Sequence, residues 1–166
     1  MKVFMLLSEA QETANRLIEF LKPYCTKIHV AGSVRREKEN VKDIEICLIP
    51  SDKKKLFNAL GTHLYKLNKE FKPTKWGQKY LQFKYEGKQI DLFIGDENNW
   101  GLLYLIRTGS AEFSTKMLAQ WKRVTQGGFS ENGYLHTADG KLVKTPDEET
   151  VFRLCKMNFV EPGMRN

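Results

Sequence analysis

The feature that most constrains this fold is a short segment in which charged and apolar residues alternate. Asp43 and Glu45 alternate with Ile44 and Ile46, and an apolar run follows at residues 47–49. A period of two indicates a β-strand, with both carboxylates on one face and the isoleucines toward a core. Two carboxylates on one face repel each other unless a cation lies between them. Because Mg²⁺ takes oxygen ligands and keeps substrate phosphates in its shell, the segment predicts a magnesium site.

The residues that precede this strand suit a phosphate group. Gly32 and Ser33 form a turn that offers backbone N–H groups and a hydroxyl, and Arg36 offers a guanidinium fork. Each half of the pattern is weak alone, since two carboxylates often mark a solvated strand edge and Gly-Ser is a common turn. Their combination, with a third carboxylate farther along the chain, favours a functional site.

The third carboxylate is Asp91, which lies in the apolar segment 88–94. Glu86 and Gly87 separate this segment from residues 80–85, so the two are predicted to form a β-hairpin. An isolated charge in an apolar strand is unfavourable unless it is paired or bound to metal, although an exposed edge would also tolerate it. A neighbouring strand that carries the first two carboxylates would complete the cluster that two-metal phosphoryl transfer requires.

The charge of the chain is basic and unevenly distributed. Its 166 residues carry a net charge of +7, and residues 66–88 hold seven lysines against two glutamates. Such a concentration favours a track for a nucleic-acid backbone over a merely solvated face. The candidate DNA-binding residues are Lys72, Lys75, Lys79 and Lys84. Phe83 and Tyr85, which interleave with the lysines, are predicted to face the core.

Three widely spaced cysteines, Cys25, Cys47 and Cys155, lack the spacing of a zinc site and indicate buried thiols in a reducing compartment. No segment has the length and apolarity of a membrane span. We therefore expect a cytoplasmic protein without membrane contact.

Further elements follow from periodicity and end signals. A helix over 8–23 is predicted to begin with a capping box of Ser8 and Gln11, and one after residue 145 with a box of Thr145 and Glu148. The other expected elements are a strand over 27–31, helices over 53–64 and 100–107, a helix from Ser110 to the glycines at 127–128, and a hairpin over 133–143.

Four motifs together resemble the family X DNA polymerases, within the polymerase-beta-like nucleotidyltransferase superfamily. The first is the Gly-Ser turn followed, after nine residues, by Asp43 and Glu45; the second is the strand at residues 89–93. The third is Thr108, Gly109 and Ser110 with Phe113, and the fourth is the E-P-x-x-R tail that ends at Arg165. Motifs in the right order over residues 30–165 make this resemblance specific.

The resemblance implies a role for each candidate residue. Asp43, Glu45 and Asp91 would be catalytic metal ligands for Mg²⁺, with Mn²⁺ as an alternative, and Asp91 would help to deprotonate a primer 3′-hydroxyl. Gly32, Ser33 and Arg36 would bind the triphosphate of the nucleotide. Its remaining contacts would come from Thr108, Gly109, Ser110 and Phe113.

The implied fold is an α/β (α+β) nucleotidyltransferase palm with a mixed β-sheet and packed helices over residues 1–98. A small C-terminal α+β lobe, a nucleotide-binding subdomain, would follow over 99–166. The chain departs from the family pattern at Glu45, where aspartate is usual, and at Ile106 and Arg107, where an aromatic pair is usual. Ser114 and Leu118 stand where asparagine and arginine are common. We expect a minimal form without the family's amino-terminal lyase domain, of the sort found in some viruses.

The function that this resemblance implies is DNA-directed DNA polymerisation at short gaps or nicks, in DNA repair. The expected partners are gapped or primer-template DNA and a dNTP, and the expected state is a monomer in the cytoplasm, or in the host cytoplasm or virion if the protein is viral. Two alternatives stay open. One is a nucleotidyltransferase with an RNA, small-molecule or protein acceptor, and the other is a DNA-binding module without catalysis.

Overall fold

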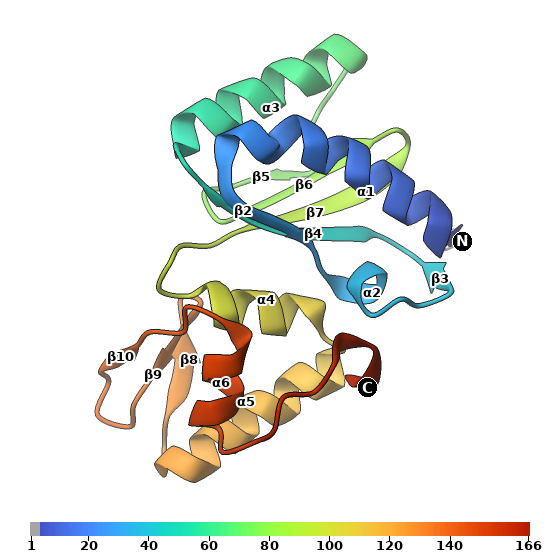
Figure 1. Ribbon diagram of the computed structural model, residues 1–166. Helices are drawn as coiled ribbons and strands as arrows, with labels where there is room; N and C mark the ends of the chain where they lie inside the picture. Colours follow the sequence, from blue (N-terminus) through green and yellow to red (C-terminus); the bar gives the residue numbers. More distant parts are fainter. Residues whose placement is uncertain (1–3) are drawn as a thin grey trace. The chain divides into compact units, whose positions relative to one another are not determined.

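The computed structural model describes residues 4–166, which form two compact units (Figure 1). Among the described residues, the first unit ends at Ile94 and the second is Gly95–Asn166. The sequence had placed this division four residues later, after residue 98. Both units combine helices with strands, and the prediction of a mixed α+β fold is confirmed.

The first unit is built on a five-stranded mixed sheet. Its strands, in spatial order, are β2 (Cys25–Val30), β4 (Ile44–Pro50), β7 (Lys88–Ile94), β6 (Tyr80–Tyr85) and β5 (Lys75–Trp76). Strands β4 and β7 are parallel, and the other neighbours are antiparallel. The predicted hairpin of β6 and β7 has the predicted bounds.

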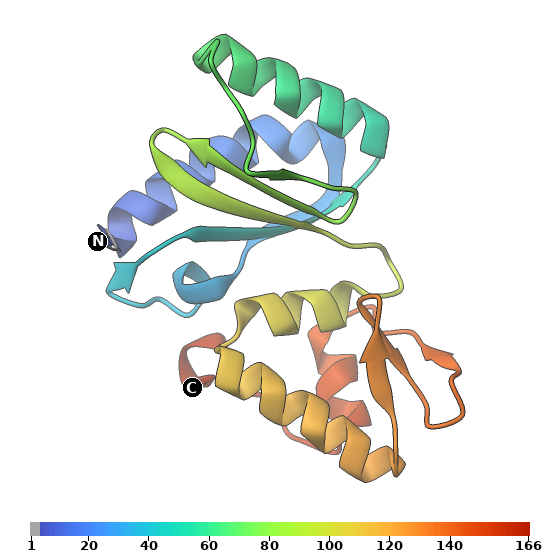
Figure 2. The ribbon, with the colours of Figure 1, turned by 180° about the vertical axis from the view of Figure 1, so that it is seen from behind.

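Helices α1 (Leu7–Leu21) and α3 (Lys53–Leu67) cover one face of this sheet, as Figures 1 and 2 show from opposite sides. Each helix buries a stripe of apolar residues on the even-numbered positions of β4 and β7 and the odd-numbered positions of β6. Phe83 and Tyr85 belong to this core, as predicted. The opposite face of the sheet therefore carries Glu45, Gln82 and Asp91.

The predicted capping box at the start of α1 is wrong. The N-cap residue is Leu6, and no side chain caps the helix. The reason is that α1 follows directly on strand β1 (Met5–Leu6), which pairs with β3 (Asn40–Val41). The N–H of Leu7 donates to the Glu39 carbonyl (3.1 Å), so a neighbouring backbone satisfies this helix end instead of Ser8. A 3-10 turn, η1 (Lys22–Tyr24), continues the helix, and β2 follows it.

The second unit packs three helices with a small antiparallel sheet. The helices are α4 (Trp100–Thr108), α5 (Ala111–Thr125) and α6 (Glu148–Leu154), and a 3-10 turn, η2 (Pro162–Met164), lies in the tail. The sheet has the order β10-β9-β8, with β8 (Phe129–Glu131), β9 (Tyr134–His136) and β10 (Leu142–Val143). The sequence predicted all of these except β8 and η2.

The capping box predicted at Thr145 is also wrong. Asp147 is the N-cap of α6, and its carboxylate accepts from the N–H of Thr150 (2.8 Å). Thr145 is held by α4 instead, because its carbonyl accepts from Gly101 N–H (2.6 Å) and its hydroxyl from Leu102 N–H (3.3 Å). A Cβ on Gly101 would overlap the backbone of Asp147, so this close approach requires glycine.

Candidate active site

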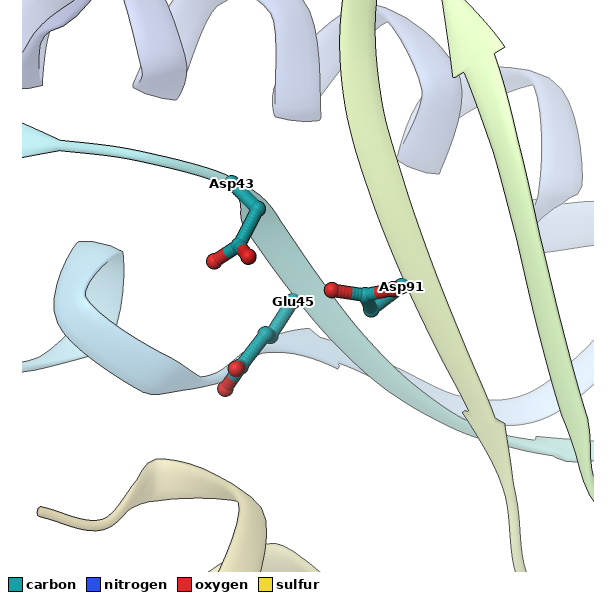
Figure 3. Close-up of side chains that lie close together, drawn as sticks. All are labelled: Asp43, Glu45 and Asp91. Carbon is teal, nitrogen blue, oxygen red and sulfur yellow. The ribbon is translucent and has the colours of Figure 1, made fainter. Parts of the chain in front are cut away.

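The structure brings the three predicted carboxylates together (Figure 3). Asp43 directly precedes β4, Glu45 lies on β4, and the parallel register places Asp91 of β7 beside Glu45. One oxygen from each side chain lies within 4.8 Å of the others. In the part of the chain that the structure describes, no other set of three His, Cys, Asp or Glu residues is spaced in this way. An all-oxygen, triply anionic donor set fits a hard divalent cation.

The carboxylates of this cluster repel one another. The pKa of Asp43 is raised, first by burial and then by the negative charge of Asp91, while Lys42 and a backbone hydrogen bond act in the opposite direction. Both raising effects disfavour the ionised form of the carboxyl, and a bound cation would reverse the second of them. The cluster therefore gains from a cation in electrostatic terms.

Asp91 is held by a polar network that sequence reasoning missed. Its Oδ1 accepts from the Tyr80 hydroxyl (2.7 Å) and from Gln82 Nε2 (2.9 Å), and Gln82 Nε2 also donates to the Tyr80 hydroxyl (3.0 Å). Gln89 Nε2 is 3.3 Å from Oδ2. The Tyr80 ring stacks on Phe93, with 4.9 Å between ring centroids. Asp91 is only 6% exposed, so these donors fix the orientation of a nearly buried carboxylate.

The Gly-Ser turn lies against Glu45. Residues Gly32–Arg35 form a short helix, α2, and the N–H of Ala31 donates to the Glu45 carbonyl (2.8 Å). Gly32 has a φ of +56°, and a Cβ there would lie 2.7 Å from Glu45 Cδ and overlap Oε2. Two features therefore require glycine at position 32: the positive φ of the backbone and the Glu45 side chain that lies over this residue.

We expect Gly32→Ala to weaken divalent-cation binding about tenfold or more, because the new methyl group displaces the Glu45 carboxylate. The measurement is the rise in melting temperature on titration with Mg²⁺ or Mn²⁺. Gly87→Ala is the matched control, since Gly87 also has a positive φ (+76°) but a Cβ there meets nothing within 4 Å. Equal metal-induced shifts in the two variants would contradict this role for Gly32.

The other predicted phosphate ligands lie on or directly after α2. Ser33 is half-buried, and Arg36, the C-cap of α2, is also half-buried. Burial lowers the pKa of Arg36, and the negative charge of Glu45 raises it. A guanidinium group remains charged under both influences. Arg36 therefore supplies a positive charge close to the carboxylate cluster.

The predicted DNA-binding lysines are all exposed, and they lie on several elements of the first unit. Lys75 pairs with Gln82 and Lys84 with Gln89, so both lie on the sheet face that carries Asp91. Lys72 lies in the loop after α3, and Lys79 directly precedes β6. Lys88, which the sequence counted in the same cluster, faces α1 instead, where its Nζ is 2.8 Å from Thr13 Oγ1.

The predicted nucleotide-binding residues of the second unit have clear roles in its fold. Thr108 is fully buried and Phe113 is 8% exposed. Ser110 is the N-cap of α5, where its hydroxyl accepts from Phe113 N–H (3.2 Å). Gly109 has a φ of +71° and forms a cis peptide bond with Ser110. A nucleotide-binding role for these residues stays a prediction.

The E-P-x-x-R tail ends in a buried ion pair. The Arg165 side chain is 0% exposed, and its Nη1 lies 2.7 Å from Glu148 Oε2. Its Nε donates to the Val160 carbonyl (2.9 Å), and its carbonyl accepts from Ser110 N–H (3.1 Å). Three phenylalanine rings lie within 5.8 Å of the guanidinium carbon, namely Phe113, Phe152 and Phe159. The arginine therefore joins α6, α5 and the tail.

Comparison with known proteins adds one finding. Residues 103–166 match a protein-family model described as the DNA polymerase beta thumb. Comparison with curated proteins gave no match. The thumb match supports a relationship to the polymerase-beta-like, family X enzymes, and it indicates a DNA-binding module in the second unit. The matched residues begin in α4 and do not include the carboxylate cluster. Over residues 4–166, no helix is long and apolar enough to cross a membrane.

Proposed function

We propose that this protein is a Mg²⁺-dependent nucleotidyltransferase of the family X type that adds dNTPs to a primer 3′-hydroxyl at short gaps or nicks in DNA, in a repair process. The observation that carries the proposal is the cluster of Asp43, Glu45 and Asp91 on two adjacent strands, in a chain that also matches a polymerase thumb. Three carboxylates within 4.8 Å are a donor set for divalent cations, with Mn²⁺ as an alternative to Mg²⁺.

Each residue of the site has a proposed part in the reaction. The Asp91 carboxylate accepts the proton of the primer 3′-hydroxyl, whose oxygen attacks the α-phosphorus of the dNTP as pyrophosphate leaves. Tyr80 and Gln82 hold that carboxylate in place. Arg36 and Ser33 bind the phosphates, and Thr108–Phe113 contact the nucleotide in the manner that the resemblance implies. A cation bound to the cluster would neutralise phosphate charge and lower the pKa of the attacking hydroxyl.

The test is nucleotide incorporation with a panel of acceptors. A single-nucleotide gapped DNA duplex, the equivalent RNA and an acceptor protein are each incubated with labelled dNTP and Mg²⁺. We expect template-directed addition to the gapped DNA. Addition to DNA without regard to the template base would support the catalytic site, but it would indicate a terminal transferase in place of a template-directed polymerase. Labelling of RNA or protein in place of DNA would contradict the proposal that the acceptor is DNA.

The thumb match itself favours one alternative, since a thumb binds DNA and is not the catalytic part of a polymerase. The alternative is a DNA-binding module without catalysis. A catalytic site must bind dNTP with Mg²⁺, and such binding raises the melting temperature by linkage. A melting temperature that rises with DNA but not with Mg²⁺ and dNTP would favour the alternative.

We expect Tyr80→Phe to slow nucleotide addition about tenfold, because Asp91 Oδ1 loses its closest donor. We expect the substitution to lower kcat, and we expect the KM for dNTP and the affinity for DNA to remain near the wild-type values. Tyr85→Phe is the matched control, since it removes a hydroxyl from the same strand on the core-facing side. An unchanged kcat in Tyr80→Phe would show that Gln82 and Gln89 position the carboxylate without Tyr80.

DNA affinity is expected to fall steeply with salt, because the exposed lysines replace counterions along the phosphate backbone. We expect a loss of at least about tenfold between about 50 mM and about 200 mM salt. Substitution of Lys75 and Lys84 by glutamine should reduce the slope of log affinity against log salt by about 1 to 2. Lys22→Gln, which removes an exposed lysine that pairs with Glu19, serves as the control. A salt-independent affinity would exclude a lysine track.

A further inference from the structure

A cavity of about 890 Å³ lies between helix α3 and strand β5, at the edge of the sheet in the first unit. It is not lined by any residue of the carboxylate cluster or of α2. Its lining combines three half-buried aromatic rings, two exposed lysines and exposed polar side chains. The residues that matter below are Trp76, Gly61, Lys53, Lys54, Asn58 and Gln78. The volume is typical of a small-ligand site.

Trp76 is the central ring of this cavity. It is half-buried, and three phenylalanines brace it, with centroid distances of 6.0 Å to Phe57, 6.2 Å to Phe71 and 6.3 Å to Phe83. A ring that its neighbours hold in one orientation loses little entropy when a flat ligand stacks on it. Nucleobases of any sequence have a face that stacks on aromatic side chains.

Gly61 opens the cavity above this ring. It lies in the interior of α3, where glycine is the least favourable residue apart from proline. The fold does not require it, since a Cβ on Gly61 would make only an ordinary contact, 3.8 Å from Trp76 Cζ2. A longer side chain would extend into the space beside the indole. The consequence of glycine at this position is therefore access to Trp76.

The two lysines that line the cavity, like Gly61, are not required by the fold. Lys53 and Lys54 open α3, at the end of a helix where positive charge is unfavourable, and the first turn contains no acidic residue. No Asp or Glu lines the cavity. Two exposed cations beside an aromatic floor match a ligand that carries phosphate groups next to flat bases.

We propose that this cavity binds an unpaired nucleotide of single-stranded DNA. The base stacks on Trp76, its edge is within the reach of the Asn58 and Gln78 amides, and the flanking phosphates bind Lys53 and Lys54. Such a site would hold a single-stranded stretch of a DNA substrate apart from the carboxylate cluster. The proposal is independent of catalysis, so it stands even if the protein does not transfer nucleotides.

The experiment compares two substitutions of one residue, Gly61→Leu and Gly61→Ala. Binding of a labelled oligothymidylate of about ten nucleotides is measured by fluorescence anisotropy in EDTA, which removes any contribution from metal. We expect Gly61→Ala to bind like wild type, because its methyl group fits. We expect Gly61→Leu to bind about tenfold more weakly, because the leucine fills the space of the base. Both variants should bind a blunt DNA duplex with equal affinity.

Intrinsic fluorescence provides a second measurement that does not depend on the folding of Gly61→Leu. The oligonucleotide should quench wild-type fluorescence by stacking on Trp76, and this quenching should be lost in Trp76→Phe. Equal oligothymidylate affinities in the two Gly61 variants, or equal quenching in wild type and Trp76→Phe, would overturn the proposal. An equal loss of duplex binding in Gly61→Leu, or complete competition by inorganic polyphosphate in both variants, would also overturn it by showing a site for charge alone.

Discussion

Asp91→Asn is expected to reduce nucleotide addition to gapped DNA by at least about a thousandfold, because it removes both a metal ligand and the acceptor of the 3′-hydroxyl proton. The substitution keeps the size of the side chain. Its remaining carbonyl oxygen can still accept from Tyr80 and Gln82, so the sheet should fold as before. The loss should therefore appear in the rate of a single addition, measured by rapid quench at saturating DNA and dNTP.

Two further measurements separate chemistry from binding in this variant. DNA affinity should remain within about twofold of wild type, since the lysines and the second unit are unchanged. Asp52→Asn is the matched control, because Asp52 is an exposed N-cap of α3 and asparagine caps a helix equally well. Addition by Asp91→Asn at the wild-type rate would show that the cluster is not the catalytic centre.

The carboxylate cluster could be predicted because the sequence of each strand indicates which residues face the core and which face the other way. Isoleucine alternates with acid in β4, and a single acid interrupts the apolar residues of β7. A parallel register then places Glu45 beside Asp91. The alternation of charged and apolar residues and the spacing of the two strands were sufficient to predict the cluster, because a charged side chain on a half-buried strand has few alternative positions.

The donors to Asp91 could not be predicted in the same way. Tyr80 and Gln82 look like ordinary outward residues of an amphipathic strand, and their role depends on the β6–β7 register, which pairs Gln82 with Asp91. The register continues across the sheet, so Lys75, Gln82, Asp91 and Glu45 form one row over four strands. Lys88 was misplaced because an odd or even position in β7 decides which face a lysine takes, and charge density carries no such information.

The capping boxes failed for a related reason. A Ser or Thr followed three residues later by Glu or Gln is a local signal, and a tertiary contact can replace it. At α1 the replacement is the Glu39 carbonyl. At α6, Thr145 is bound by α4 instead, and a different local residue, Asp147, caps the helix. Local patterns therefore predicted the existence of these helices, whereas the partners of their first residues depended on the fold.

Arg165→Ala is expected to destabilise the second unit by about 3 to 5 kcal/mol, because it leaves the Glu148 carboxylate buried without its partner. Arginine and glutamate are 0% and 6% exposed, and the guanidinium also loses its bond to the Val160 carbonyl and its contacts with three phenylalanine rings. The measurement is urea unfolding followed through tryptophan fluorescence, since Trp100 and Trp121 are both buried in this unit.

Two comparisons identify the cause of this loss. The double variant Arg165→Met with Glu148→Leu should recover most of the stability, because an apolar pair of similar volume removes the unpaired charge. Lys141→Ala breaks an exposed ion pair with Asp139 and should change stability by less than about 0.5 kcal/mol. If Arg165→Ala unfolds at the same urea concentration as wild type, Arg165 does not stabilise the second unit. If it unfolds at a lower urea concentration, the arginine of the E-P-x-x-R tail has a structural role in the second unit.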